Sequence, residues 1–216
     1  MSDGLDLLVH QLRPSRGEPE GALVLLHGRG TNEFDLLPLL DELDPDRRFV
    51  GVTARAPLEL SPGGFHWYVT RTLGYPDHDT FHHSYALAAR WLDALADALG
   101  VPWSRTVLGG FSMGAVMSYA LGLGAGRPAP AGILAFSGFM PTVDGFELDL
   151  SGRDGYPVAI GHGTQDPVIP VEFGRDARRR LEEAGARVLY RESPMFHAID
   201  PAFVQVLQSW VVELIQ

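Results

Sequence analysis

The amino-acid sequence predicts an α/β fold in three layers, with a mostly parallel sheet and helices on both of its faces. Short apolar runs of strand length alternate along the chain with longer segments of helical periodicity, which is typical of consecutive βαβ units. Several of these runs are apolar nearly throughout, as expected for strands that are covered on both sides. The chain has 216 residues, of which 45% are hydrophobic, so it can bury one substantial core. We therefore expect residues 1–216 to form a single domain.

The strands are predicted where apolar residues follow one another over a short stretch. These stretches lie at residues 5–12, 22–28, 48–54, 105–111, 131–138, 156–163 and 187–193. The first two strands are separated only by the turn-like segment RPSRGEPEG, which favours an antiparallel hairpin at one edge of the sheet. The later strands are separated by helical segments, which favours parallel pairing.

Helices are predicted between the strands, where apolar residues recur at i, i+3 and i+4. The longest such segment is TFHHSYALAARWLDALADALG at residues 80–100. Another helix begins at Ser112 and ends near Leu123, before the glycine-rich segment GLGAGRPAP. The remaining helices are predicted at residues 34–43, 170–184 and 198–214.

Composition argues against several classes of function. The net charge of −10 disfavours nucleic acid as a partner, and the basic stretch RDARRR at residues 175–180 is expected on a solvated helix face. The chain contains no cysteine, which excludes disulfides, thiolate metal sites and a cysteine nucleophile. The first residues lack the pattern of a signal peptide, and no apolar run reaches the ~18 residues of a membrane span. We therefore expect a cytoplasmic protein without stable membrane insertion.

A serine stands at the junction of a predicted strand and a predicted helix. Gly110, Ser112 and Gly114 form the pattern G-x-S-x-G within VLGGFSMGA. In this context the pattern predicts a nucleophile elbow, a sharp turn that strains the serine backbone and exposes its hydroxyl. Side chains at the two glycine positions would collide with the neighbouring strand or helix. The following helix directs its first N–H groups toward the place where negative charge would develop. We therefore predict that Ser112 is a nucleophile.

A serine nucleophile requires a histidine base and an acid that orients this base. In α/β-hydrolases the chain order is serine, acid, histidine. Asp166 lies in GHGTQDPVIP and His197 lies in SPMFHAID, and each of these segments follows a predicted strand. Open α/β sheets place their sites at the carboxyl ends of strands. The sequence therefore predicts a catalytic triad of Ser112, Asp166 and His197.

Other pairings keep the same chain order. His162 with Asp144 or Asp149 satisfies it, but the gap leaves little room for an intervening strand and helix. A pairing of His162 with Asp166 would leave His197 without a role.

Two backbone N–H groups are expected to form an oxyanion hole. One belongs to Met113, the residue after the nucleophile, and the other to Arg29 in the loop LLHGRGTNE. Gly28 and Gly30 let this loop come close to a substrate, although a plain glycine turn would look the same. His27 precedes the serine in the chain, so we interpret it as a hydrogen-bonding brace of the loop.

Four stretches together resemble the phospholipase/carboxylesterase family of small α/β-hydrolases: LLHGRGTNEFDLLPL, GGFSMGAVMSYAL, GHGTQDPVIP and the final FHAI. The resemblance covers about residues 20–214, and the family includes acyl-protein thioesterases and bacterial carboxylesterases. It implies a three-layer α/β-hydrolase fold and a serine hydrolase acting on carboxylic esters or thioesters. The triad that it implies is again Ser112, Asp166 and His197.

One position departs from the family pattern. Family members commonly have glutamine directly after the nucleophile, whereas this chain has Met113. The expected oxyanion contact comes from the backbone, so the chemistry is retained while the pocket loses a polar side chain. The segment GGFHWY at residues 63–68 also resembles the part of the family that lies beside the acyl pocket.

Large side chains in loops near the predicted strand ends belong either to the core or to the wall of an acyl pocket. They are Phe65, Trp67, Tyr68, Phe139, Met140 and Phe196. Of these we predict Trp67, Phe139, Met140 and Phe196 as substrate-binding residues. Many lipases insert a cap where this chain has residues 136–157, but the segment is short and rich in glycine, proline and aspartate. We therefore expect no separate cap domain.

No cofactor or metal is expected. His78 and His82 have the i, i+4 spacing of a helical metal pair, with His83 beside them, but no third ligand is evident. We interpret this group as the solvated start of a helix.

The expected partner is a small-molecule ester or thioester. The oligomeric state stays open, with a homodimer as one option. Two alternatives to an esterase also stay open: a non-catalytic module that binds an acyl ligand, and a peptidase or lactone hydrolase that uses the same triad.

Overall fold

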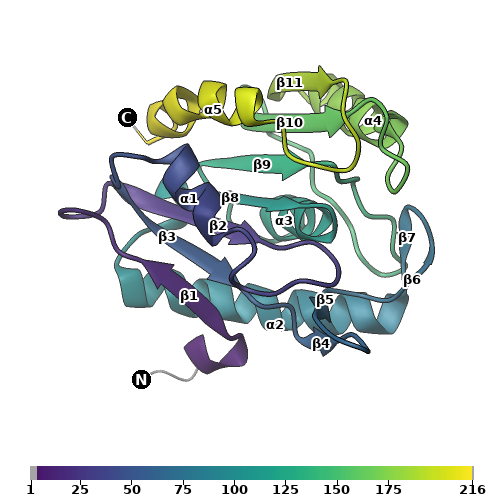
Figure 1. Cartoon of the computed structure of the whole chain (residues 1–216), viewed down its shortest axis with the longest axis horizontal. Helices are drawn as coiled ribbons and strands as arrows, with labels where there is room; N and C mark the ends of the chain where they lie inside the picture. The colour runs from purple at the N-terminus through teal and green to yellow at the C-terminus, as the bar shows by residue number, and fades with distance from the viewer. Residues whose placement is uncertain (1–3, 216) are drawn as a thin grey trace.

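The computed structural model describes residues 4–215 and is built on a seven-stranded sheet in the order β1-β3-β2-β8-β9-β10-β11 (Figure 1). These strands are β1 (His10–Arg13), β2 (Gly21–Leu26), β3 (Phe49–Ala54), β8 (Thr106–Phe111), β9 (Gly132–Phe136), β10 (Pro157–Gly163) and β11 (Arg187–Ser193). All neighbouring pairs are parallel except β1 with β3.

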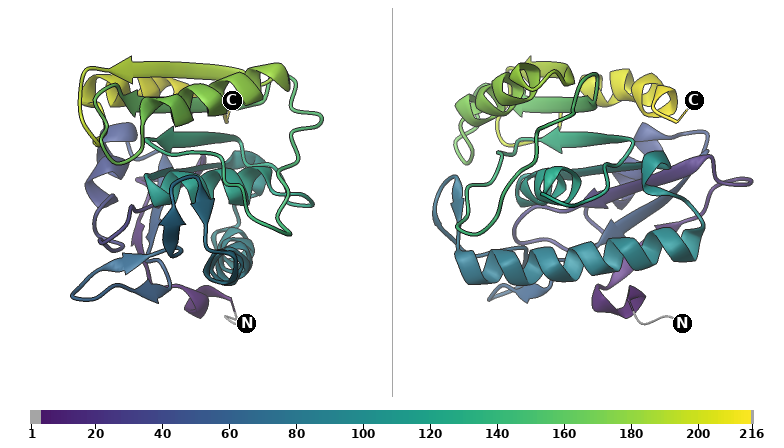
Figure 2. Two further views of the ribbon diagram at one scale, coloured as in Figure 1. Left: turned by 90° about the vertical axis from the view of Figure 1, so that its right-hand side faces the viewer. Right: turned by 180° about the vertical axis from the view of Figure 1, so that it is seen from behind.

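Helices cover both faces of the sheet, which confirms the predicted three layers (Figures 1 and 2). They are α1 (Leu37–Leu43), α2 (His78–Leu99), α3 (Met113–Leu123), α4 (Val171–Glu183) and α5 (Pro201–Glu213). The side chains of α1 and α5 share one apolar cluster with the sheet, whereas α2, α3 and α4 pack on the opposite face. Every residue of α3 is buried, because this helix lies between the sheet and its two neighbours.

The prediction that the first two strands pair as a hairpin is wrong. β1 lies at the sheet edge and is antiparallel, as predicted, but its partner is β3 rather than β2. β2 is buried over its whole length and uses both of its edges for parallel neighbours, so it has no edge left for β1. The side chain of Arg13 anchors β1 in this position by donating to Leu40 O at 2.7 Å, Phe49 O at 2.9 Å and Asp44 Oδ2 at 2.5 Å.

Two connections at the carboxyl ends of the strands surround the predicted site. Between β3 and α2 the chain forms two small hairpins, β4 (Leu58–Glu59) with β5 (Phe65–His66) and β6 (Thr70–Thr72) with β7 (Tyr75–Pro76). Between β9 and β10 the chain contains no helix, so the expected absence of a cap domain agrees with the structure. Within residues 4–215, no helix is both long enough and apolar enough to cross a membrane.

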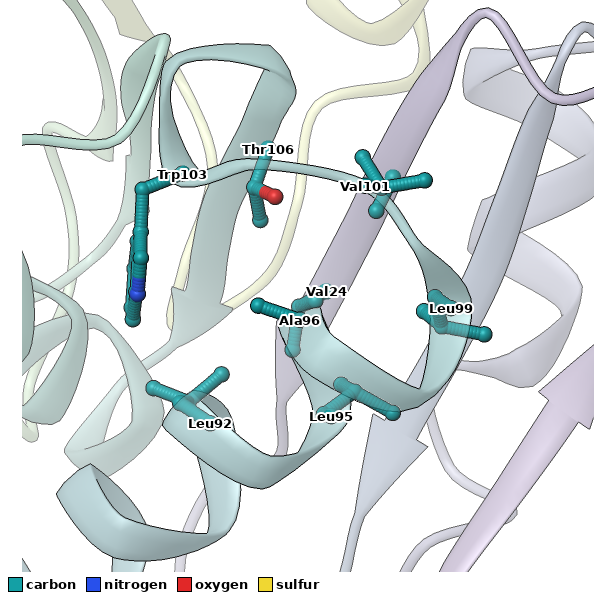
Figure 3. Close-up of a pocket in the computed structure, with 9 residues that line it drawn as sticks. Val24, Leu92, Leu95, Ala96, Leu99, Val101, Trp103 and Thr106 are labelled. Carbon is teal, nitrogen blue, oxygen red and sulfur yellow. The ribbon is translucent and has the colours of Figure 1, made fainter.

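At the opposite end of the sheet, α2 leaves a small apolar gap of about 10 Å³ against the first residues of β2 and β8. Figure 3 shows the side chains around this gap, among them Leu92, Leu95 and Trp103. Because the gap is apolar and only about the size of one water molecule, it is a packing defect and not a binding site.

Candidate active site

Ser112 occupies a sharp turn between β8 and α3. Its backbone has φ 55° and ψ −117°, a conformation that non-glycine residues rarely adopt. The glycines on either side are required by space. A Cβ on Gly110 would lie 2.7 Å from Leu26 O, and a Cβ on Gly114 would overlap the same carbonyl group. The structure thus agrees with the strained turn expected from G-x-S-x-G.

Asp166 and His197 are joined by a hydrogen bond. The His197 ring donates from Nδ1 to Asp166 Oδ2 at 2.6 Å. The other carboxylate oxygen, Oδ1, accepts the backbone N–H groups of Val168 at 2.8 Å and Ile169 at 2.9 Å. Burial by itself would raise the pKa of the Asp166 carboxyl, but the bonds from His197 and the two amides outweigh it and hold this pKa below its ordinary value. Asp166 therefore stays ionised and can orient the imidazole.

The His197 ring lies beside the strand that ends at the serine. Its centroid is 4.7 Å from that of Phe111, the residue directly before Ser112. Among the described residues, Ser112 Oγ has no hydrogen-bond partner, so its hydroxyl is not bonded to the imidazole of His197 in this structure. Such contacts often tighten only when a substrate is bound.

The alternative base, His162, is placed differently. It is 3% exposed, and its Nε2 donates to Ile169 O at 2.8 Å. His162 does not line the cavity beside Ser112, and burial lowers its pKa. The alternative acids have other partners. The backbone carbonyl of Asp144 is bonded to His82, and the carboxylate of Asp149 accepts from the hydroxyl of Ser151. The geometry thus favours His197 as the partner of Asp166.

The loop after β2 brings a second backbone N–H to the site. Arg29 and Met113 line the same cavity as Ser112, and within residues 4–215 neither backbone N–H has a protein acceptor. Both groups are therefore free to bind an oxygen atom of a substrate.

His27 holds this loop from both ring nitrogens. Its Nε2 accepts the N–H of Ala56 at 3.0 Å, so the hydrogen resides on Nδ1, which donates to Gly28 O at 2.6 Å. The indole of Trp67 donates to His27 O at 2.9 Å. Burial lowers the pKa of His27 and keeps the ring neutral. His27 therefore braces the loop, as expected from the sequence.

A cavity of about 280 Å³ opens beside Ser112. It is lined by Arg29, Tyr68, Thr70, Leu73, Ser112, Met113, Phe139, Val168 and Ile169. Most of these side chains are apolar, which suits an acyl chain.

Of the four predicted substrate-binding side chains, the cavity is lined only by Phe139. Trp67 is fully buried in the core beneath the loop of His27, and Met140 packs among the side chains of α3 and α4. Phe196 is 67% exposed and stands at the surface near His197. These three side chains therefore do not line this cavity, and their role in substrate binding stays a prediction.

Several wall residues were not predicted to bind substrate, although Tyr68 was considered as either core or pocket wall, and they lie in or directly after recognised motifs. Tyr68 ends the segment GGFHWY, and Thr70 and Leu73 come from the hairpin after it. Val168 and Ile169 follow Asp166 within two and three positions. The motifs could have indicated these neighbours, but the direction of each side chain depends on the loop conformation.

The histidines at the start of α2 lie close together. The rings of His78 and His82 lie 4.6 Å apart, and His82 Nε2 bonds to Asp144 O at 2.8 Å. In the described part of the chain, no group of three or more metal-binding side chains could hold an ion.

Comparison with known proteins gives the family. The model of the Phospholipase/Carboxylesterase family matches residues 10–215. Acyl-protein thioesterase 1 of Cryptococcus neoformans is 27% identical over 221 residues, which cover 90% of this chain and 92% of that protein. The carboxylesterase of Bacillus cereus superposes with a TM-score of 0.83 at 24% identity, covering 96% of this chain and 94% of the other. The carboxylesterase of Mesorhizobium loti gives a TM-score of 0.81 at 22% identity, covering 95% of both chains. The two structures support the α/β-hydrolase fold, and the family match over nearly the whole sequence shows that this chain is a hydrolase of the phospholipase/carboxylesterase family.

Proposed function

We propose that the protein is a serine hydrolase of carboxylic esters or thioesters, with Ser112 as nucleophile, His197 as general base and Asp166 as the acid that orients it. The observation that carries this proposal is the 2.6 Å bond between His197 Nδ1 and Asp166 Oδ2. The ring centroid of His197 lies 4.7 Å from that of Phe111, the residue before the serine in the strained strand-to-helix turn. The bond to Asp166 leaves Nε2 of the imidazole free to take a proton from a hydroxyl.

The reaction proceeds through an acyl-enzyme. His197 Nε2 takes the proton of Ser112 as Oγ attacks the carbonyl carbon. The oxyanion is bound by two backbone N–H groups, that of Arg29 in the loop after β2 and that of Met113 in the first turn of α3. When the intermediate collapses, the imidazolium gives its proton to the departing alcohol or thiol. Water then attacks the acyl-enzyme with His197 again as base, which releases the acid and restores the Ser112 hydroxyl.

The cavity supports an acyl substrate of modest length. Leu73, Phe139 and Ile169 give it apolar walls, and the segment between β9 and β10 adds no cap above it. The names acyl-protein thioesterase and carboxylesterase, which similar proteins carry, also support a thioester or ester substrate. Met113, where family members commonly have glutamine, makes the lining of the cavity more apolar.

The Ser112→Ala variant tests the proposal. Turnover of p-nitrophenyl acetate and labelling by a fluorophosphonate probe should both be lost, while the far-UV circular dichroism stays unchanged, because only one hydroxyl is removed. Ser137→Ala is a matched control, since Ser137 also follows a strand of the sheet with a positive φ of 50° but is fully buried away from the cavity. A folded Ser112→Ala variant that keeps its turnover would contradict the proposal. Labelling without turnover of any ester, thioester, peptide or lactone would instead favour a ligand-binding module.

A further inference from the structure

One buried histidine has no part in the proposed reaction. His162 stands in β10 with its side chain completely enclosed, and among residues 4–215 its Nδ1 has no hydrogen-bond partner. On the side of α4 it faces Gly174, where a Cβ would lie only 2.6 Å from Nδ1. A buried nitrogen without a partner is unfavourable, and an apolar side chain of similar size would avoid this cost. Packing alone therefore does not explain why a histidine occupies this position.

The hydrogen bond made by the other ring nitrogen, Nε2, explains the presence of a histidine. Nε2 bonds to the carbonyl oxygen of Ile169 at 2.8 Å. A carbonyl can only accept, so Nε2 carries the hydrogen and Nδ1 is the bare nitrogen. Burial lowers the pKa of His162, which keeps the ring in this neutral form.

Ile169 is thereby held through both of its peptide groups. Its N–H is bound by Asp166 Oδ1 at 2.9 Å, and its C=O is bound by His162. The same residue lines the cavity beside Ser112. A shift of this short loop would therefore move the acid of the triad and the wall of the acyl cavity together.

The distance to the carboxylate is also informative. His162 Nε2 lies 3.7 Å from Asp166 Oδ2, the oxygen that accepts from His197. This separation is too long for a hydrogen bond. Because Ile169 O takes the His162 hydrogen, Oδ2 is left to His197 alone.

We propose that His162 is a positioning residue, whose Nε2–H fixes the loop of residues 166–169 so that Asp166 faces His197 and Ile169 faces the substrate. This inference rests on the proposed triad. It gives the buried histidine a role in orienting the base without any contact with the reacting atoms.

The test compares two substitutions of similar size. In His162→Gln the side-chain amide can reach the place of Nε2 and donate to Ile169 O, whereas in His162→Leu no donor remains. We expect kcat to fall by about tenfold to a hundredfold in His162→Leu, which is the effect of one lost buried hydrogen bond on the transition state, and to recover to within a few-fold of wild type in His162→Gln. KM for medium-chain esters should also rise in His162→Leu, because Ile169 lines the acyl cavity.

A mutant cycle with Asp166→Asn separates positioning from general stability. If His162 acts through Asp166, His162→Leu should cost little further turnover once the carboxylate is absent. Equal losses in both backgrounds, or wild-type kcat in a folded His162→Leu variant, would overturn the inference. Wild-type turnover in Asp166→Asn alone would instead overturn the proposed triad.

A spectroscopic measurement covers the case in which His162→Leu does not fold. In ¹⁵N-histidine-labelled wild type, His162 should show the neutral Nε2–H form. The His197 Nδ1 proton should give a low-field signal that is preserved in His162→Gln and shifted in His162→Asn, whose shorter amide cannot reach Ile169 O. A His197 signal that is the same in all three proteins would contradict the positioning role.

Discussion

At the scale of single residues, two buried histidines make the fold sensitive to pH. Burial is the largest influence on both His27 and His162, and it lowers the pKa of each ring. In the unfolded chain both rings titrate near the ordinary value of about 6.5. Between that value and the lowered one, the unfolded chain binds protons that the folded protein does not. The two histidines therefore contribute fully to the free energy of unfolding above about pH 6.5, and this contribution decreases as the pH falls below that value.

This dependence can be measured by urea unfolding between pH 7 and pH 5. Each of the two histidines should contribute a slope of up to about 1.4 kcal/mol per pH unit. The variant with both His27→Gln and His162→Gln should have a flatter profile over this range. Asp166 and Asp200, whose pKa values are held below the ordinary carboxyl range by hydrogen bonds despite burial, lose their contribution only at lower pH. A double variant with the wild-type slope would show that these rings are not the source.

At the scale of secondary-structure elements, α2 illustrates how packing stabilises the fold away from the site. Leu95 is 3% exposed and borders the small gap in Figure 3, at the end of the sheet opposite Ser112. In Leu95→Ala the gap would grow, and we expect the free energy of unfolding to fall by about 2–5 kcal/mol. Turnover per folded molecule should stay the same, because the carboxyl ends of the strands are not disturbed.

The control on the same helix is Asp97→Ala, which changes an exposed side chain and should alter the free energy of unfolding by no more than about 0.5 kcal/mol. Chemical denaturation of both variants, followed by ester turnover, gives the comparison. Equal stability of Leu95→Ala and Asp97→Ala would mean that α2 does not depend on this contact.

The elements also show what the sequence could reveal. The strand ending at Ser193 and the helix from Met113 lie within a residue of their predicted bounds. For the helix, a long apolar run and a glycine-rich end give a strong local signal. The partner of β1 could not be predicted, since it depends on which edges of β2 are already occupied. Strands β4 to β7 have only two or three residues each, too few for an alternating pattern to stand out.

The candidate site also has features that the sequence could indicate and features that it could not. Ser112, Asp166 and His197 could be proposed as a triad from the sequence because each follows a predicted strand, and backbone topology brings the carboxyl ends of parallel strands together. The directions of Trp67 and Met140 were not recognisable, because a large apolar side chain suits the core and a cavity wall equally well.

At the scale of the whole molecule, the absence of a helical cap over the described site determines how substrates reach it. The connection between β9 and β10 carries no helix, and the cavity of about 280 Å³ is bordered by the hairpins between β3 and α2 and by the loop of Asp166. A segment this short does not fold into an independent cap, so no lid has to open at a lipid surface. Substrates should therefore be hydrolysed directly from solution.

The length of the acyl chain provides the corresponding test. Each methylene group that reaches the walls formed by Leu73, Phe139 and Ile169 can add up to about 0.8 kcal/mol of binding. Beyond the cavity a longer chain meets water and gains nothing, so kcat/KM should rise with chain length and then level off or fall. The measurement is kcat/KM for p-nitrophenyl esters from acetate to palmitate, with and without a lipid–water interface. Phe139→Ala should shift the best chain length, whereas the control Phe196→Ala should not, because Phe196 lies outside the cavity. A jump in rate above the micelle threshold, or a best substrate at the longest chain, would contradict an open site of this size.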